Sequence, residues 1–308
     1  MRMDLLYAAT VLPSNIHLVV PFPAGGGADS MARALAQGMS VELERNVVVE
    51  NKSGAGGAIG AEYVARSAPD GSTWLLGTMG VLSINPALYS KLHYDPSKDF
   101  SPISLSYLTP RVLVVNAKLP VKNVLELVEM AKSKPGQLTY GSSGNGSSSH
   151  LAGVMFASLS NTNMLHVPYK GSALLLTDLL ANRVDMAFDD YAVYEEHIKN
   201  GTLRILGITS KKRTPWLPNI PTLAESGVEN YELSNWVGIL AVKGTPADLI
   251  KAFNGAWVNV SNGNSFKQHF YEVGIEPTSS TPEAFNALIK SEALKWSEII
   301  KKSGTKID

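Results

Sequence analysis

The hydrophobic residues of the chain follow two patterns, short continuous runs and a recurrence at every third or fourth position. Short apolar runs rich in β-branched residues, such as 16–20, 47–50, 74–78 and 112–116, predict buried strands. Apolar residues that recur at every third or fourth position predict helices between them, beginning with residues 31–43. The same patterns predict further strands at 138–140, 166–168, 182–190, 203–209 and 236–242, and helices through 63–65, at 84–89 and 124–131, from 151 onward, and at 172–180, 246–260 and 282–301. This alternation of strands and helices is typical of an α/β fold.

The length of the chain favours two lobes. At 308 residues it is longer than a single hydrophobic core comfortably supports. The chain is expected to leave the first lobe near 105–110 and to return to it from about Trp236. We therefore expect one α/β lobe from residues 16–108 plus 235–308 and a second from residues 109–234.

The stretch 138–150 has the sequence of a binding loop. Its predicted strand ends in glycines and hydroxyls, and helical spacing begins at Leu151. Gly144 and Gly146 permit positive φ angles and a close approach to a ligand. The first turn of a helix offers N–H groups without intrahelical acceptors and the positive end of a dipole, and both suit an anion. Taken alone, a capped helix after an ordinary turn is an equally good interpretation.

A second loop of the same kind occupies residues 18–30. An apolar strand runs through two prolines and three glycines into a helix, for which Asp29 or Ser30 is the expected N-cap. Two such loops, one in each lobe, suggest two binding loops that converge on a single negatively charged group.

Composition excludes several classes of partner. Lysine plus arginine equals aspartate plus glutamate at 27 each, so no broad positive field exists to hold nucleic acid or an anionic membrane. The chain has no cysteine, which excludes disulfides, thiolate catalysis and cysteine-based metal sites. No apolar run reaches the roughly 18 residues of a membrane-spanning helix.

Residues 1–15 precede the expected fold. Their apolar stretch is short, Asp4 lies near its start, and no small-x-small cleavage site precedes Ile16. We interpret this segment as a leader or an expression remnant rather than an intact export signal.

The sequence does not favour catalysis. The glycine loops that begin at Gly25, Gly54 and Gly144 lack the last glycine of the dinucleotide fingerprint. A hydrolase that uses Ser147–Ser149 with His150 is an alternative, but neighbouring residues on a helix do not face each other and no G-x-S-x-G elbow occurs. His150 is interpreted as a packing residue behind the loop. The six histidines are scattered without an H-E-x-x-H motif, so neither a metal nor a cofactor is expected.

Six separated segments between residues 16 and 308 form one further pattern. They are Pro21–Gly26 with Asp29 and Arg33, residues 48–57, Tyr140–Leu151, Val167–Ser172, Leu179–Met186 and Gly244–Pro246. In this order they resemble the Bug family of extracytoplasmic solute receptors, also called tripartite tricarboxylate transporter receptors. The resemblance implies a type II periplasmic-binding-protein fold, in which two α/β lobes joined by two crossovers hold a ligand in their cleft.

The resemblance also implies a function. A periplasmic monomer would capture a small carboxylate, either a dicarboxylate or an aromatic acid, by hinge closure and deliver it to membrane transporter subunits. A receptor that signals to a membrane sensor would use the same cleft and is the alternative. Carried over by position, the expected ligand-binding residues are Phe22, Pro23, Ala24, Gly25, Gly26, Thr78, Met79, Gly80, Ser142, Gly146, Ser147, Ser148, Tyr169 and Asp189.

Two charged residues are candidates for specificity. Arg111 begins a strand where the chain enters the second lobe, and its guanidinium is suited to take a second ligand carboxylate bidentately. A solvent-facing hinge arginine with a surface ion pair is the other open interpretation. Asp189 would repel an anion, so we expect it to pair with Lys170 or to face an ammonium or hydroxyl of the ligand. Trp216 and Trp236 are interpreted as packing residues rather than as platforms for an aromatic acid.

Overall fold

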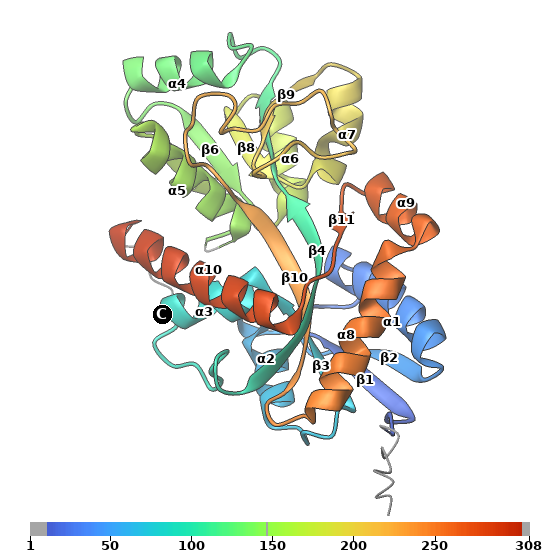
Figure 1. The fold of residues 1–308 in the computed structure, drawn as a ribbon. Helices are drawn as coiled ribbons and strands as arrows, with labels where there is room; N and C mark the ends of the chain where they lie inside the picture. Colours follow the sequence, from blue (N-terminus) through green and yellow to red (C-terminus); the bar gives the residue numbers. More distant parts are fainter. Residues whose placement is uncertain (1–10, 146, 304–308) are drawn as a thin grey trace, which may run out of the picture.

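The computed structural model describes residues 11–145 and 147–303. It contains two sheets with helices packed against them, and these form two α/β lobes (Figure 1). Most of the expected leader, residues 1–10, lies outside the described residues, and the first strand begins at Asn15.

The first lobe is built on a six-stranded sheet with the order β11-β4-β10-β3-β1-β2. β1 pairs in parallel with β2 and β3, whereas β10 runs antiparallel to β3 and β4. The strands are β1 (Asn15–Val20), β2 (Asn46–Asn51), β3 (Thr73–Thr78), β4 (Phe100–Pro110), β10 (Ser234–Val242) and β11 (Glu276–Pro277). The helices are α1 (Gly27–Leu43), η1 (Ala55–Gly57), α2 (Ala58–Ala65), η2 (Gly80–Ile84), α3 (Asn85–Leu88), α8 (Ala247–Asn262), α9 (Asn264–Glu272) and α10 (Pro282–Ser303).

The second lobe is built on a five-stranded sheet with the order β7-β6-β8-β5-β9. β6 pairs in parallel with β7 and β8, and β5 is antiparallel to β8 and β9. Its strands are β5 (Val112–Asn116), β6 (Thr139–Ser142), β7 (Leu165–Pro168), β8 (Met186–Asp189) and β9 (Leu203–Ile208). Its helices are α4 (Val124–Ser133), α5 (Ser148–Ser160), α6 (Ser172–Leu180) and α7 (Tyr191–Lys199).

The chain passes between the sheets twice, and the two crossings are bonded to each other. The first crossing is Arg111, between β4 and β5, and the second follows β9 through Thr209. The Arg111 N–H donates to Thr209 Oγ1 at 2.7 Å, and the Thr209 N–H donates to the Arg111 carbonyl at 2.9 Å. The Leu233 N–H, just before β10, donates to the Thr209 carbonyl at 2.8 Å. These bonds hold both crossings in one hinge.

Hydrophobic patterning explains which face each element buries. β5 reads Val-Leu-Val-Val-Asn and all five residues are buried, as expected for a strand covered on both faces. In α8 the buried residues include Leu249, Phe253, Ala256 and Trp257, whose spacing gives one apolar stripe facing the sheet. The patterns of the sequence therefore fix both the elements and their orientation.

Two helix starts differ from expectation. The first helix begins at Gly27 with Gly26 as its N-cap, so the prediction of Asp29 or Ser30 as the cap is wrong. α5 begins at Ser148 rather than at Leu151, because Ser147 supplies the cap. Both helices thus begin closer to their glycine loops than the apolar spacing indicates.

Helix α10 packs against the first sheet at Gly238. A Cβ added to Gly238 in β10 would lie 2.2 Å from Phe285 Cζ on α10 and 2.6 Å from the Ser104 carbonyl. We expect Gly238→Ala to lower the free energy of unfolding by about 1–3 kcal/mol, because the core has no room for a methyl group. Denaturant unfolding followed by circular dichroism measures this change.

Gly255 provides the control for this prediction. It is exposed within α8, and a Cβ there meets nothing within 4 Å. We expect Gly255→Ala to raise the free energy of unfolding by up to about 1 kcal/mol, because alanine has the higher helix propensity. Equal effects of the two substitutions would contradict the close packing at Gly238.

Candidate ligand-binding site

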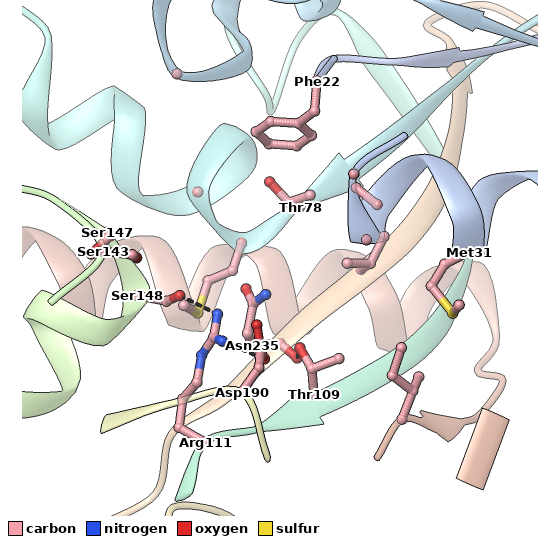
Figure 2. A pocket seen from close by; sticks show the side chains of 18 of the residues that line it. Phe22, Met31, Thr78, Thr109, Arg111, Ser143, Ser147, Ser148, Asp190 and Asn235 are labelled. Carbon is pink, nitrogen blue, oxygen red and sulfur yellow. Dashed lines mark hydrogen bonds and ion pairs between the residues drawn. The ribbon is translucent and has the colours of Figure 1, made fainter. Parts of the chain in front are cut away.

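A cavity of about 1130 Å³ lies between the two lobes (Figure 2). Residues from both sheets, from both glycine loops and from the crossing strands line it. From the first lobe and the crossing strands these are Phe22–Ala28, Ser30, Met31, Gly56, Thr78–Gly80, Ile84, Asn85, Leu88, Tyr89, Tyr107, Thr109, Arg111, Asn235, Val237 and Val273–Ile275. From the second lobe they are Ser143–Asn145, Ser147, Ser148 and Asp190–Val193.

The first loop joins β1 to α1 and is fastened by a carboxylate behind it. Gly25 has a φ of +81°, which favours glycine, and its N–H donates to Asp29 Oδ2 at 3.0 Å. Asp29 also accepts from Arg33 Nε at 2.9 Å and from Asn51 Nδ2 at 2.9 Å. The Arg33 hydrogen bond, followed by those from Gly25 and Asn51, lowers the pKa of Asp29 to about 2. Asp29 is therefore occupied in holding the loop, which leaves the start of α1 to glycines.

The start of α1 borders the cavity directly. Gly26, Gly27 and Ala28 all line it, and no side chain caps this helix. The first-turn N–H groups of a helix have no intrahelical acceptor and carry its positive partial charge. A ligand anion is the natural partner for them.

The second loop joins β6 to α5 and is held by its own serines. Ser147 Oγ accepts from the His150 N–H at 3.2 Å as the N-cap and donates to the Gly144 carbonyl at 2.7 Å. The buried Ser149 accepts from the Ser143 N–H at 2.9 Å. Ser147 and Ser148 then line the cavity, at the start of a helix from the opposite lobe.

Arg111 forms a charge cluster at one side of the cavity. Its Nη1 lies 3.3 Å from Asp189 Oδ1 and forms a second ion pair with Asp190 Oδ1. Its Nη2 donates to Ser148 Oγ at 2.6 Å (Figure 2). Burial lowers the pKa of Arg111, but the charges of Asp190 and Asp189 raise it on balance. Burial raises the pKa of the Asp189 carboxyl, and the charge of Arg111 opposes this rise.

Most of the residues expected from the sequence come together in this cavity. Phe22, Pro23, Ala24, Gly25, Gly26, Thr78, Met79, Gly80, Arg111, Ser147 and Ser148 line it. Gly146 lies outside the described residues. The structure places three other expected residues, Ser142, Tyr169 and Asp189, outside the lining.

Each of these three residues has a supporting contact instead. Ser142 is buried behind the loop, with its Oγ 2.6 Å from His166 Nε2. The Tyr169 hydroxyl donates to Asp178 Oδ2 at 3.0 Å. Asp189 pairs with Arg111 and not with Lys170, so an internal ion pair is present but the expected partner is wrong.

Arg111 differs from both interpretations of its sequence position. It is 7% exposed, so the solvent-facing hinge arginine is wrong. It is also already paired with two carboxylates, which the hypothesis of a free guanidinium did not include. Asp190, which directly follows the predicted Asp189, supplies the second of these two carboxylates.

Several lining residues were missed by the sequence analysis. Asp190 directly follows Asp189, and two consecutive carboxylates at a strand end are a signal that one faces the cleft. Thr109 and Asn235 are partners across β4 and β10, a register that no local pattern reveals. The other missed positions include Gly27, Ala28, Met31, Tyr107 and Tyr191.

Trp216 and Trp236 pack against other aromatic side chains and do not face the cavity. Trp236 is buried against Phe285 and Trp216 packs against Tyr191, and neither tryptophan lines the cavity, as a packing role requires. The described residues contain no group of three or more potential metal ligands. Within the same residues, no helix combines the length and apolar character required to cross a membrane.

Three stacked rings support the second loop from behind. The His150 and His166 rings lie 3.9 Å apart with 14° between their planes, and Tyr140 stacks on His166 at 5.0 Å. Burial, followed by the charge of His166, lowers the pKa of His150 to about 4. Burial also lowers the pKa of His166. The stack therefore consists of neutral rings near pH 7.

This stack predicts how stability depends on pH. A histidine in the unfolded chain titrates near about 6.5, so between pH 6.5 and about 4 the unfolded state binds a proton that folded His150 does not. The free energy of unfolding should therefore fall as the pH decreases through this window. His150→Gln should flatten the fall, as urea unfolding at pH 5 and pH 7 will show. Between pH 7 and 8 the two proteins should share one slope, and identical slopes below pH 6.5 would contradict the role of the stack.

Comparisons with known proteins agree on one family. A family model described as the tripartite tricarboxylate transporter family receptor matches residues 31–305. Protein BugT of Bordetella pertussis is 33% identical over 293 residues, which cover 95% of this chain and 90% of BugT.

Solved structures agree on the fold. The R. palustris protein Rpa4515 with adipate is 34% identical, with a TM-score of 0.81 over 95% of this chain and 98% of that one. MatC of Rhodopseudomonas palustris with bound malate is 27% identical, with a TM-score of 0.75 over 93% and 98% of the two chains. The type II periplasmic-binding-protein fold expected from the sequence is confirmed. The chain belongs to the tripartite tricarboxylate transporter receptor family, as its resemblance to the Bug proteins indicated.

Proposed function

We propose that this protein is a periplasmic solute receptor that captures a small carboxylate between its lobes and delivers it to the membrane subunits of a tripartite tricarboxylate transporter. One observation carries the proposal: the starts of α1 and α5, one from each lobe, line the same cavity. Each supplies the positive end of a helix and N–H donors, which is an arrangement that suits an anion.

Neutral groups would hold the ligand carboxylate. Burying a charge is costly unless hydrogen bonds replace its water. The backbone at Gly26–Ala28 offers such donors, and so does the hydroxyl of Ser148, which accepts from Arg111 and keeps its own proton. Ser147 lines the cavity beside Ser148. The wall of the cavity near these loops includes Phe22 and Met79. We propose that these residues, with Pro23, Ala24, Gly25, Thr78 and Gly80, form the carboxylate site.

Closure of the lobes would complete this site. The hydrogen bonds among Arg111, Thr209 and Leu233 keep the two crossings together, so rotation there changes the distance between the lobes while the crossings stay in register. A closed lobe pair excludes water, which strengthens the hydrogen bonds to the anion. The closed form would be the one that the transporter recognises. We propose that the receptor acts as a monomer.

The size and lining of the cavity limit the ligand. Beyond the loops, the walls carry apolar and aromatic side chains such as Met31, Tyr107 and Ile275, which suit a hydrocarbon chain or an aromatic ring. Dicarboxylates are bound in two similar structures, as adipate and as malate. Aliphatic and aromatic acids are therefore the first compounds to screen.

The start of α1 can be tested with a matched pair of variants. Ala28 lies in its first turn and lines the cavity. Ala28→Asp places a negative charge where the ligand carboxylate is proposed to lie, although aspartate is a favourable residue near a helix start. Hexanoate, adipate, malate and benzoate are first screened for a rise in Tm. For each acid that raises the Tm, calorimetry should give an affinity at least about tenfold weaker for Ala28→Asp than for Ala28→Asn, whose side chain has the same size as aspartate but no charge.

Hexanamide is the control ligand, because it matches hexanoate in size but carries no charge. It should not raise the Tm of the wild-type protein. Equal affinities of the Asp and Asn variants for a bound acid would place the carboxylate elsewhere in the cavity.

A further inference from the structure

The two charged side chains among the described lining residues differ in how far they are exposed. Among the described residues that line it, Arg111 is the only cationic side chain and Asp190 is the only anionic one. Arg111 is 8% exposed in its side chain, whereas Asp190 is 49% exposed. A ligand in the cavity therefore meets the carboxylate far more than the guanidinium.

The guanidinium has little left to offer a second ligand carboxylate. A bidentate pair needs two neighbouring N–H groups pointing at the same partner. Nη1 is shared between Asp189 and Asp190, and Nη2 bonds Ser148. Nε is buried and finds no partner in the part of the chain that the structure describes. The remaining N–H of Nη2 neighbours this buried Nε, so without displacing Asp190 it could give a ligand carboxylate only a single hydrogen bond.

The charge of the cluster leads to the same conclusion. With both aspartates ionised, one guanidinium and two carboxylates carry a net charge of −1. With Asp189 protonated, the net charge would be zero. In neither state does the cluster carry a positive charge that attracts an anion.

The exposed carboxylate shares the cavity with other oxygen acceptors. Asp190 Oδ1 meets Arg111, and Oδ2 finds no partner within residues 11–145 and 147–303. Thr109 and Asn235 line the same cavity, and the Thr109 hydroxyl donates to the Asn235 carbonyl at 3.2 Å, which leaves its own lone pairs available (Figure 2). Asp190 lies near the end of β4, because it pairs with Arg111, the residue that follows this strand. Asp190, Thr109 and Asn235 thus present carboxylate, hydroxyl and amide oxygens to the same cavity, and oxygens of these kinds suit the three donors of an ammonium group.

We propose that Asp190 selects a ligand that carries an ammonium group at the end opposite to its carboxylate. The carboxylate lies between the helix starts of α1 and α5, and the ammonium lies at Asp190 with Thr109 and Asn235. This inference rests on the proposed function, because it needs the helix starts to hold the carboxylate. It assigns the specificity of the cavity to Asp190 and gives Arg111 the role of holding that carboxylate in place.

Matched ligand series test the proposal. Calorimetry on the wild-type protein compares 4-aminobutanoate, 5-aminopentanoate and 6-aminohexanoate with succinate, glutarate and adipate and with butanoate, pentanoate and hexanoate. At one chain length, the amino acid should bind at least about tenfold more tightly than both the dicarboxylate and the monocarboxylate. A dicarboxylate that binds more tightly than every amino acid would overturn the inference.

Asp190→Asn gives a readout that a merely structural role would not produce. The variant keeps the size of the side chain, and Asp190 makes no side-chain cap bond to α7 that could be lost. It should weaken the best amino acid at least about tenfold and strengthen the dicarboxylate of the same length, because Arg111 loses one of its two carboxylates. Loss of affinity for both ligands alike, or for neither, would contradict selection by Asp190.

Glu225→Gln is the matched control. Glu225 is also paired with an arginine of the second lobe, Arg213, at 2.9 Å, and it does not line the cavity. The Glu225→Gln variant should leave the ratio of amino acid affinity to dicarboxylate affinity unchanged. If no compound of the three series binds, and malate and benzoate do not bind either, the proposed carboxylate receptor itself fails. Binding of dicarboxylates in preference to amino acids rejects the role of Asp190 alone.

Discussion

Among the described residues that line the cavity between the lobes, none offers an unpaired positive charge, and this constraint shapes the proposed site. Its one arginine is buried and already paired with two aspartates. A carboxylate in this cavity must therefore be stabilised by dipoles, namely the N–H groups and hydroxyls at the starts of α1 and α5. Such groups are fixed by the backbone, so they need little reorganisation when the ligand enters. They also come from opposite lobes, so the binding energy of one small anion depends on the lobes being close together.

The supporting residues keep these helix starts free. Asp29 lies at the first turn of α1 but faces the loop behind it, where Gly25, Arg33 and Asn51 satisfy its carboxylate. Ser149 is buried beneath the second loop. The hinge adds the remaining constraint, because Thr209 bonds both crossings. The elements that bear the proposed site are thus held by hydrogen bonds, and we propose that the lobes move about the place where the chain crosses between sheets.

The sequence predicted the local features well, because these depend on neighbouring residues. Apolar periodicity located β1, β5 and α8, and the glycines and serines of the two loops identified the segments that line the cavity. The pairing of Arg111 with Asp189 and Asp190 joins residues almost eighty positions apart, and no local pattern carries that information. The N-cap of α1 was wrong for a similar reason. Asp29 has the side chain of a cap, but its carboxylate is held by Asn51 and Arg33, and the glycine before the helix takes the cap position.

The most direct test of the account is a crystal structure with the acid that gives the largest rise in Tm. The account predicts a closed protein in which one carboxylate lies within about 3 Å of N–H groups at the start of α1 and of donors at the start of α5. A carboxylate bound to Arg111, with both helix starts facing solvent, would contradict it.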